Sequence, residues 1–206
     1  MKTEETYLKD IAHIRNIMDT NTRFLSLSGL SGIIAGAYAI IGSLIAKRII
    51  TSEAVIEYGV VKISYDTLYK LVGIALGVLF LSVLTGFILT RVKANKNGEK
   101  IWTKASKKML FNFSVPLLTG GIFCISLINQ SNFGIIAPAT LIFYGIALFN
   151  ASKYTLTEVK YLGLSEIILG LIAMNFIGYG LYFWALGFGA LHIVYGAIMY
   201  FKNERK

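Results

Sequence analysis

Residues 69–90 read YKLVGIALGVLFLSVLTGFILT, and no charged residue follows Lys70 within this stretch. At 1.5 Å per residue, a helix of this length spans about 33 Å, which is enough to cross the roughly 30 Å hydrocarbon core of a bilayer. A helix also satisfies its backbone hydrogen bonds internally, as the interior of a membrane requires. The stretch therefore predicts a transmembrane helix.

Comparable apolar stretches recur along the chain. Its 206 residues are 55% hydrophobic and only 15% charged, a balance too apolar for an ordinary water-facing surface. We predict an all-α fold, a six-helix transmembrane bundle that forms one domain over residues 24–201, followed by a cytoplasmic tail at 202–206. The predicted spans cover residues 24–46, 69–90, 109–128, 133–151, 159–177 and 180–201.

The boundary between the third and fourth spans has an alternative. Only the four polar residues 129–132 separate the two apolar stretches, which would also fit one bent span. Pro116 and Pro138 lie inside the two stretches, and their combined length of about 40 residues exceeds one crossing. Two spans are therefore favoured.

The distribution of basic residues predicts a direction. Cytoplasmic loops accumulate Lys and Arg because translocating these residues is costly. With the amino terminus inside, sixteen of the twenty Lys and Arg residues fall in cytoplasmic connections, and only Lys47, Arg48, Lys62 and Lys70 lie outside. We therefore predict that both chain ends are cytoplasmic. The polar first residues differ from the short basic leader of a cleavable signal, so we expect the first span to be retained.

Two segments outside the predicted spans have a periodicity of their own. Within residues 1–23, apolar side chains recur at three- and four-residue spacing, which predicts an amphipathic helix. These side chains are Tyr7, Leu8, Ile11, Ile14 and Met18. The helix has two placements, flat on the inner leaflet or packed under the bundle. The connection from Lys47 to Asp66 alternates partly and predicts a short external β-hairpin.

A formal net charge of +9 would suggest nucleic acid in a soluble protein. Here the basic residues flank apolar stretches, so we expect membrane lipids as partners and no nucleic acid. Residues 91–108 form the main basic connection. Four of its lysines follow near helical spacing: Lys100, Lys104, Lys107 and Lys108. They are interpreted either as a lipid-anchoring face or as a docking site for a cytoplasmic or membrane protein partner.

A short pattern occurs twice in the chain. Residues 29–36 read GLSGIIAG and residues 163–170 read GLSEIILG, identical at six of eight positions. A weaker counterpart, LLTG, lies at 117–120 in the third span. The returning spans carry Thr85-Gly86, Tyr144-Gly145 and Tyr195-Gly196 at comparable depth. The pattern predicts three parallel helical hairpins, and chance similarity between Gly-rich spans is the alternative.

Glu166 and His192 are ionisable residues inside predicted spans. Each lies 13 residues from Tyr179, in the turn between the fifth and sixth spans. Both would therefore lie about 20 Å from that turn, at similar depth in the inner half of the bilayer. Small residues such as Gly163 and Gly189 permit close helix approach, so a direct or water-bridged hydrogen bond between the pair is expected.

This pair has two interpretations. Gly32 and Pro116 occupy the corresponding positions in the other hairpins, so the pair is specific to the last one. A histidine and a buried carboxyl group can exchange a proton, as a relay or a coupling site for transport. The structural alternative is a hydrogen bond that joins two helices, or a Glu166 side chain that reaches the cytoplasmic interface.

Motifs of soluble enzymes are missing from the sequence. It contains no Walker loop, no zinc-ligand cluster and no CxxC pattern, its only histidines are His13 and His192, and its only cysteine is Cys124. We therefore expect no metal site, no cofactor and no enzymatic activity. An intramembrane enzyme that uses Glu166 and His192 as acid and base would lack an evident nucleophile.

The opening of the chain carries one resemblance. The residues concerned are His13-Ile14-Arg15, Met18, residues 22–32 (TRFLSLSGLSG) and Ala35-Gly36. This block looks like the opening of small bacterial multi-pass integral membrane proteins with no assigned activity. The resemblance covers about the first 40 residues and implies a bacterial inner-membrane location. It brings no ligand or function with it.

Two functional hypotheses follow from these patterns. The first is a non-enzymatic membrane scaffold or regulator that binds a partner at its basic cytoplasmic face. The second is a small proton-linked transporter or channel in which Glu166 and His192 line the path. A water-filled cavity that reaches the pair would favour the second hypothesis.

Overall fold

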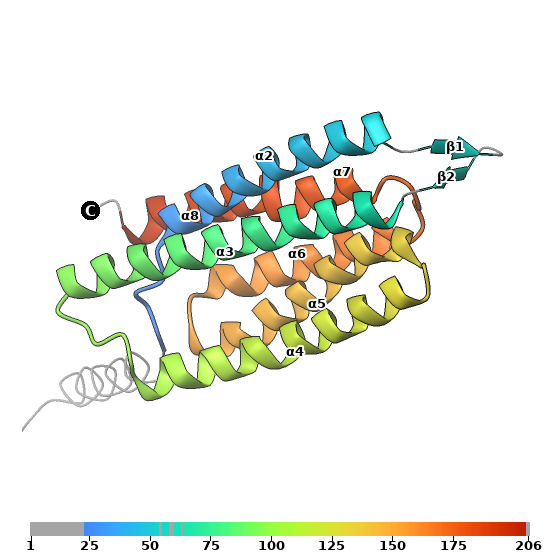
Figure 1. Ribbon diagram of the computed structural model, residues 1–206. Coiled ribbons are helices and arrows are strands. Elements are labelled where there is room, and N and C mark those ends of the chain that lie inside the picture. Colours follow the sequence, from blue (N-terminus) through green and yellow to red (C-terminus); the bar gives the residue numbers. More distant parts are fainter. Residues whose placement is uncertain (1–22, 54, 58–59, 63, 205–206) are drawn as a thin grey trace, which may run out of the picture.

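The computed structural model describes residues 23–53, 55–57, 60–62 and 64–204 (Figure 1). Helix α2 covers Gly29–Glu53, and the short strands β1 (Val55–Glu57) and β2 (Val60–Lys62) follow and pair antiparallel. The other α-helices are α3 (Tyr65–Lys96), α4 (Lys104–Asn129), α5 (Ile136–Ala151), α6 (Thr157–Ala173), α7 (Gly180–Trp184) and α8 (His192–Asn203). A π-helix, η3 (Ala185–Leu191), joins α7 to α8, and the 3-10 turns η1 (Phe133–Ile135) and η2 (Ser152–Tyr154) flank α5.

Within the described residues, five helical segments are long and apolar enough to cross a membrane, as in a multi-pass helical membrane protein. They are Gly29–Glu53, Tyr65–Lys96, Lys104–Asn129, Phe133–Tyr154 and Gly180–Lys202. Helix α6 has 17 residues, or about 25 Å of helix, and packs along α5. The helical fold and the multi-pass character agree with the prediction from the apolar stretches.

Helix α2 begins at Gly29, later than the predicted residue 24. The preceding residues are held by tertiary hydrogen bonds: the Phe24 N–H donates to the Tyr154 carbonyl at 2.7 Å, and the Thr155 hydroxyl donates to the Phe24 carbonyl at 2.7 Å. These bonds replace the first helical turn. Of the predicted amphipathic segment, residues 1–22 lie outside the described residues.

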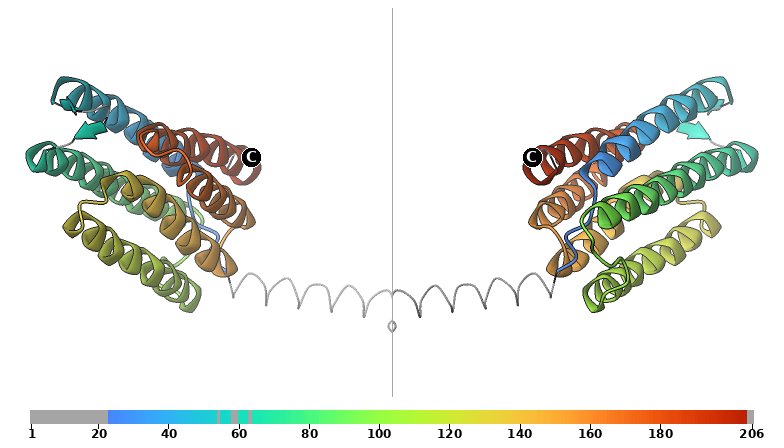
Figure 2. Two further views of the ribbon diagram at one scale, coloured as in Figure 1. Left: turned by 90° about the vertical axis from the view of Figure 1, so that its right-hand side faces the viewer. Right: turned by 90° about the vertical axis from the view of Figure 1, so that its left-hand side faces the viewer.

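Two helix pairs approach each other most closely at glycines. Helix α2 crosses α8 where a Cβ atom on Gly29 would lie 2.6 Å from the Gly196 carbonyl oxygen. Helix α6 crosses α5 where a Cβ atom on Gly163 would lie 2.7 Å from the Gly145 carbonyl oxygen. Only glycine fits such close backbone contacts. Helix α2 also packs against α3, and α4, at the opposite edge of the bundle from α2 and α8, packs against α5 (Figure 2).

Candidate functional site

Three polar side chains from three helices meet inside the bundle, where Glu166 and His192 are buried and Tyr144 is half-buried. Glu166 lies in the middle of α6, His192 is the first residue of α8, and Tyr144 lies in α5. His192 Nδ1 lies 3.4 Å from Glu166 Oε1, and His192 Nε2 lies 2.8 Å from the Tyr144 hydroxyl oxygen. The histidine therefore stands between a carboxyl group and a phenol.

The hydrogen bonds of His192 indicate where its proton lies. Nδ1 is also 3.0 Å from the carbonyl oxygen of Gly187, which can only accept. In this contact Nδ1 therefore carries the proton, and in the neutral imidazole Nε2 accepts from the Tyr144 hydroxyl. When the ring is doubly protonated, Nε2 donates to the Tyr144 oxygen instead. Tyr144 can serve both forms by turning its hydroxyl.

Glu166 is the least satisfied polar group of the site. Its side chain is 0% exposed, and neither carboxyl oxygen has a hydrogen-bond partner among the residues that the structure describes. The 3.4 Å approach to His192 is an ion-pair distance without hydrogen-bond geometry, because Nδ1 is aimed at Gly187. The structure thus brings the two residues of the predicted pair within 3.4 Å of each other. Glu166 does not reach the surface.

A π-helix and a glycine make room for the carboxyl group. A Cβ atom on Gly187, within the π-helix Ala185–Leu191, would lie 2.5 Å from Glu166 Oε2 and 2.5 Å from a methyl carbon of Leu141. Any side chain at position 187 would therefore displace Glu166 or Leu141. π-Helical turns are rare and occur frequently at functional sites, which fits the position of this segment directly before His192.

Tyr144 was not predicted from the sequence as a member of the site. Its ring stacks on the His192 ring at 5.4 Å between centroids and packs edge-to-face on Phe113 of α4 at 5.9 Å. The sequence marks this position only by the Tyr144-Gly145 pair, which resembles Tyr195-Gly196 in another returning span and does not indicate a contact with His192. A neutral phenol gives no charge signal inside a span, so its role depends on a tertiary contact.

An apolar groove of about 370 Å³ lies between α3 and α4 and reaches Tyr144. Its two walls are single stripes at helical spacing. The α3 stripe consists of Val83, Gly86, Phe87 and Thr90, and the α4 stripe of Ser106, Met109, Leu110 and Phe113. The rest of the lining comes from α5 and α6, including Tyr144 and Val159, from the α3–α4 connection with Ile101 and Trp102, and from Phe24, Leu27 and Ser31. The lining does not include Glu166 or His192, so this groove stops at Tyr144 and does not reach the predicted pair.

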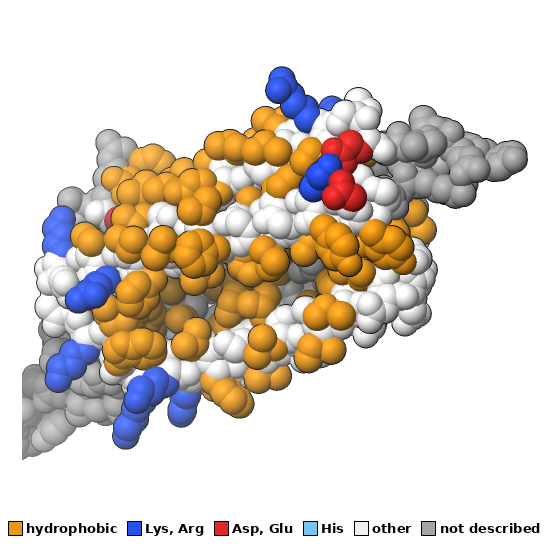
Figure 3. Space-filling view, viewed as in Figure 1, with side chains coloured by type: hydrophobic (Ala, Val, Ile, Leu, Met, Phe, Trp, Pro, Cys, Tyr) orange, Lys and Arg blue, Asp and Glu red, His pale blue; other side chains and the backbone are white. Residues whose placement is uncertain are grey.

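Basic side chains gather where α3 ends and α4 begins (Figure 3). The predicted contact residues Lys100, Lys104, Lys107 and Lys108 are all exposed there. No ion pair involves them within the described part of the chain. Two other lysines at this end have acidic partners: Lys93 lies 3.2 Å from Glu204 and Lys202 lies 2.5 Å from Glu158. Within the described residues, these four exposed lysines form a basic surface that can attract an anion.

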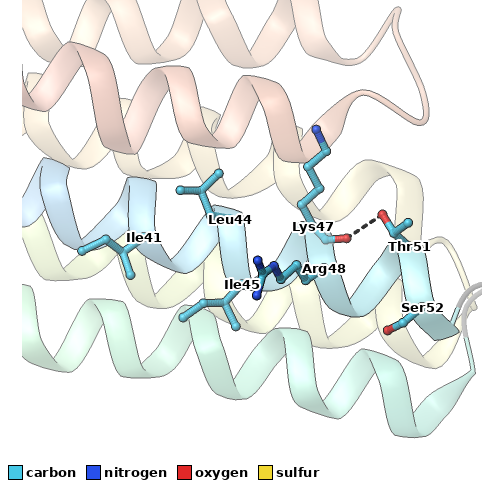
Figure 4. A pocket seen from close by; sticks show the side chains of 7 residues that line it. All are labelled: Ile41, Leu44, Ile45, Lys47, Arg48, Thr51 and Ser52. Atoms are coloured by element: carbon cyan, nitrogen blue, oxygen red, sulfur yellow. Dashed lines mark hydrogen bonds between the residues drawn. The ribbon is translucent and has the colours of Figure 1, made fainter.

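Besides the groove, a second hollow lies along the carboxyl-terminal half of α2 (Figure 4). It is lined by Ile41, Leu44, Ile45, Lys47, Arg48, Thr51 and Ser52. All of these belong to one helix, and the bond drawn there, from the Thr51 hydroxyl to the Lys47 carbonyl at 2.9 Å, is internal to that helix. A hollow with one wall gives no convergent chemistry, so it is not a candidate site.

Comparisons with protein-family models, with curated proteins and with solved structures find no match. The resemblance to small bacterial membrane proteins stays a prediction. Among the residues that the structure describes, no group of three or more His, Cys, Asp and Glu side chains is placed to hold a metal ion. The basis for a function is therefore the Tyr144–His192–Glu166 chain, the groove beside it and the basic end of the bundle.

Proposed function

We propose that this protein is a small proton-linked transporter or channel, with the Tyr144–His192–Glu166 chain as its proton site. One observation carries the proposal: Glu166 is fully buried beside a histidine and has no hydrogen-bond partner in the described structure. An ionisable group at membrane depth costs about 3 kcal/mol or more. Two helices can be joined at far lower cost by a serine or an asparagine, so a bare carboxyl group favours a functional role.

The same proposal includes a topology. Helix α6 is the sixth span, since 17 residues are at the lower end of what crosses a bilayer. The chain lies in a bacterial inner membrane with both ends in the cytoplasm, and its spans form three parallel hairpins: α2 with α3, α4 with α5, and α6 with the segment from α7 to α8. The basic end of the bundle supports this orientation.

The chemistry of the site follows from its charge states. At this buried position Glu166 is favoured either protonated beside a neutral His192 or ionised beside an imidazolium, because each arrangement leaves the pair without net charge. A proton that arrives at the Tyr144 hydroxyl can pass to His192 Nε2 while Tyr144 takes the replacement. The imidazolium then neutralises the Glu166 carboxylate 3.4 Å away. Loss of that proton leaves one uncompensated buried charge.

Proton flux in reconstituted liposomes tests the proposal. Purified protein is placed in vesicles that contain the pH-sensitive dye pyranine, and a potassium gradient with valinomycin drives proton movement. We expect flux above that of protein-free vesicles, and loss of the excess in Glu166→Gln and in His192→Phe. Glu158→Gln is the matched control, because it makes the same chemical change on the same helix at the basic end.

The result also separates function from structure. If Glu166→Gln and His192→Phe lower thermal stability but leave proton flux equal to that of the wild type, the pair only joins helices and the transport proposal fails. If wild-type vesicles conduct no more protons than empty ones, the proposal fails as well.

A second candidate function is a membrane scaffold or regulator that docks a partner at its basic end. The observation in its favour is the exposed lysine group Lys100, Lys104, Lys107 and Lys108, which lacks ion pairs within the described residues. The test is the triple variant Lys104→Gln, Lys107→Gln, Lys108→Gln. Unchanged recovery of every protein that co-purifies with the wild type would eliminate this candidate.

A further inference from the structure

The two glycine contacts of the bundle have the same register. In both pairs, glycines of an outgoing helix meet the returning helix at two levels, and the partner residues correspond position by position. A Cβ atom built on the first residue of each pair would lie 2.6 or 2.7 Å from an atom of the second residue. The pairs are Gly29 with Gly196, Gly36 with Ile193, Gly163 with Gly145, and Gly170 with Ile142.

The helices α3 and α4 are the third pair of outgoing and returning helices, and they make no equivalent glycine contact. Gly86 of α3 stands at the position of the returning-helix glycines, and a Cβ atom on it would meet nothing within 4 Å. In α4, Phe113 stands where α2 and α6 have Gly29 and Gly163. A phenylalanine there prevents the close approach that glycine permits, so the groove takes the place of a helix contact.

We propose that this groove binds the hydrocarbon chain of a fatty acid, with the anionic carboxylate at the basic end of the bundle. The α3 stripe from Val83 to Thr90 is about 10 Å long, roughly two thirds of one leaflet's share of a 30 Å core. This length suits a chain from a single leaflet. A partner's transmembrane helix would need a contact through the whole core. The groove shares Tyr144 with the proton site and includes neither Glu166 nor His192 in its lining, and binding of a hydrocarbon chain requires no proton transfer.

The basic end of the bundle supplies the charge for the head of such a molecule. Trp102 and Ser106 line the groove near this end, and the exposed Lys104 and Lys107 extend from the first turns of α4. These lysines have no ion pair within the described residues. Apolar walls and exposed cations near one end together match an apolar tail with an anionic head. A neutral lipid would use only the walls.

Tryptophan quenching by a brominated fatty acid tests this site directly. The chain has two tryptophans, Trp102 in the groove lining and Trp184 in α7. The full chain is placed in phosphatidylcholine nanodiscs as two single-tryptophan variants. Trp184→Phe leaves the fluorescence of Trp102, and Trp102→Phe leaves that of Trp184. Dibromostearate should quench Trp102 saturably and at a lower lipid fraction than it quenches Trp184. Stearate should compete, and its methyl ester, which carries no charge for a lysine to attract, should compete about fivefold less well.

Two glycines of α3 provide matched variants. Gly86→Phe fills the groove, whereas Gly77→Phe adds the same bulk at another open position of the same helix. Both were open before substitution, so both variants should fold. Saturable quenching should disappear in Gly86→Phe and persist in Gly77→Phe.

Several results would overturn the proposal. Quenching that is linear in lipid fraction, or equal in the two variants, excludes a defined site. Equal competition by stearate and its methyl ester excludes recognition of the anion. A wild-type dimer that Gly86→Phe converts to a monomer without change in quenching would assign the groove to contact between copies.

Discussion

The close contact between α5 and α6 gives a sharp test of the packing. In Gly163→Ala, the new Cβ atom would lie 2.7 Å from the Gly145 carbonyl oxygen and 2.8 Å from the Phe149 backbone nitrogen. Both are backbone atoms and can move only with the helix, so overpacking should cost about 1–3 kcal/mol. Against this, replacing a helical glycine with alanine gains about 1 kcal/mol. Gly86→Ala has the same gain, and its Cβ atom meets nothing within 4 Å.

The difference between the two variants isolates the packing cost, because the helix propensity term cancels. Gly163→Ala should be about 1–3 kcal/mol less stable than Gly86→Ala, or about 2–12 °C lower in melting temperature for a chain of this size. Circular dichroism during heating in one detergent measures both variants. Gly29→Ala, with its equivalent contact on α8, should behave like Gly163→Ala. If Gly163→Ala melts with or above Gly86→Ala, the close backbone contact is wrong.

Two further predictions concern polar contacts. Tyr144→Phe removes the hydroxyl that lies 2.8 Å from His192 Nε2 and should lower the free energy of unfolding by about 1–3 kcal/mol. The loss in the matched variant Tyr195→Phe should be smaller, and equal losses in thermal unfolding would contradict the central position of Tyr144. Glu204→Ala removes a carboxylate that accepts hydrogen bonds from the Gly29 N–H at 2.5 Å and from Lys93 at 3.2 Å. The variant should lower the free energy of unfolding by about 1–3 kcal/mol. A melting temperature equal to that of the wild type would exclude a stabilising contact between Glu204 and α2.

The apolar stretches predicted the helices well and their ends poorly. Hydropathy marks where a chain leaves lipid, whereas a helix continues until its backbone finds another partner. Helix α3 therefore runs past the predicted residue 90 to Lys96. In contrast, Phe24 leaves the helix because it bonds to Tyr154 and Thr155, far away in the chain. Such bonds leave no local pattern.

The candidate site was partly visible in the sequence. Equal spacing from Tyr179 placed Glu166 and His192 at one level, and the structure places them 3.4 Å apart. The hydrogen bond between His192 Nδ1 and the Gly187 carbonyl could not be predicted from the sequence. It depends on the π-helix Ala185–Leu191, and two glycines in that segment do not by themselves predict a π-helix.

The π-helix between α7 and α8 links the orientation of one imidazole ring to two neighbouring helices. Its Gly189 lies against α2 near Ile40, and its Gly187 lies against Glu166 on α6. Each π-type hydrogen bond encloses one residue more than an α-type bond. Reversion to α-helical bonding would advance the register by one residue and turn the following segment by about 100°. His192 would then rotate away from Tyr144, so the π-helical register of residues 185–191 is what aims the imidazole ring at Tyr144.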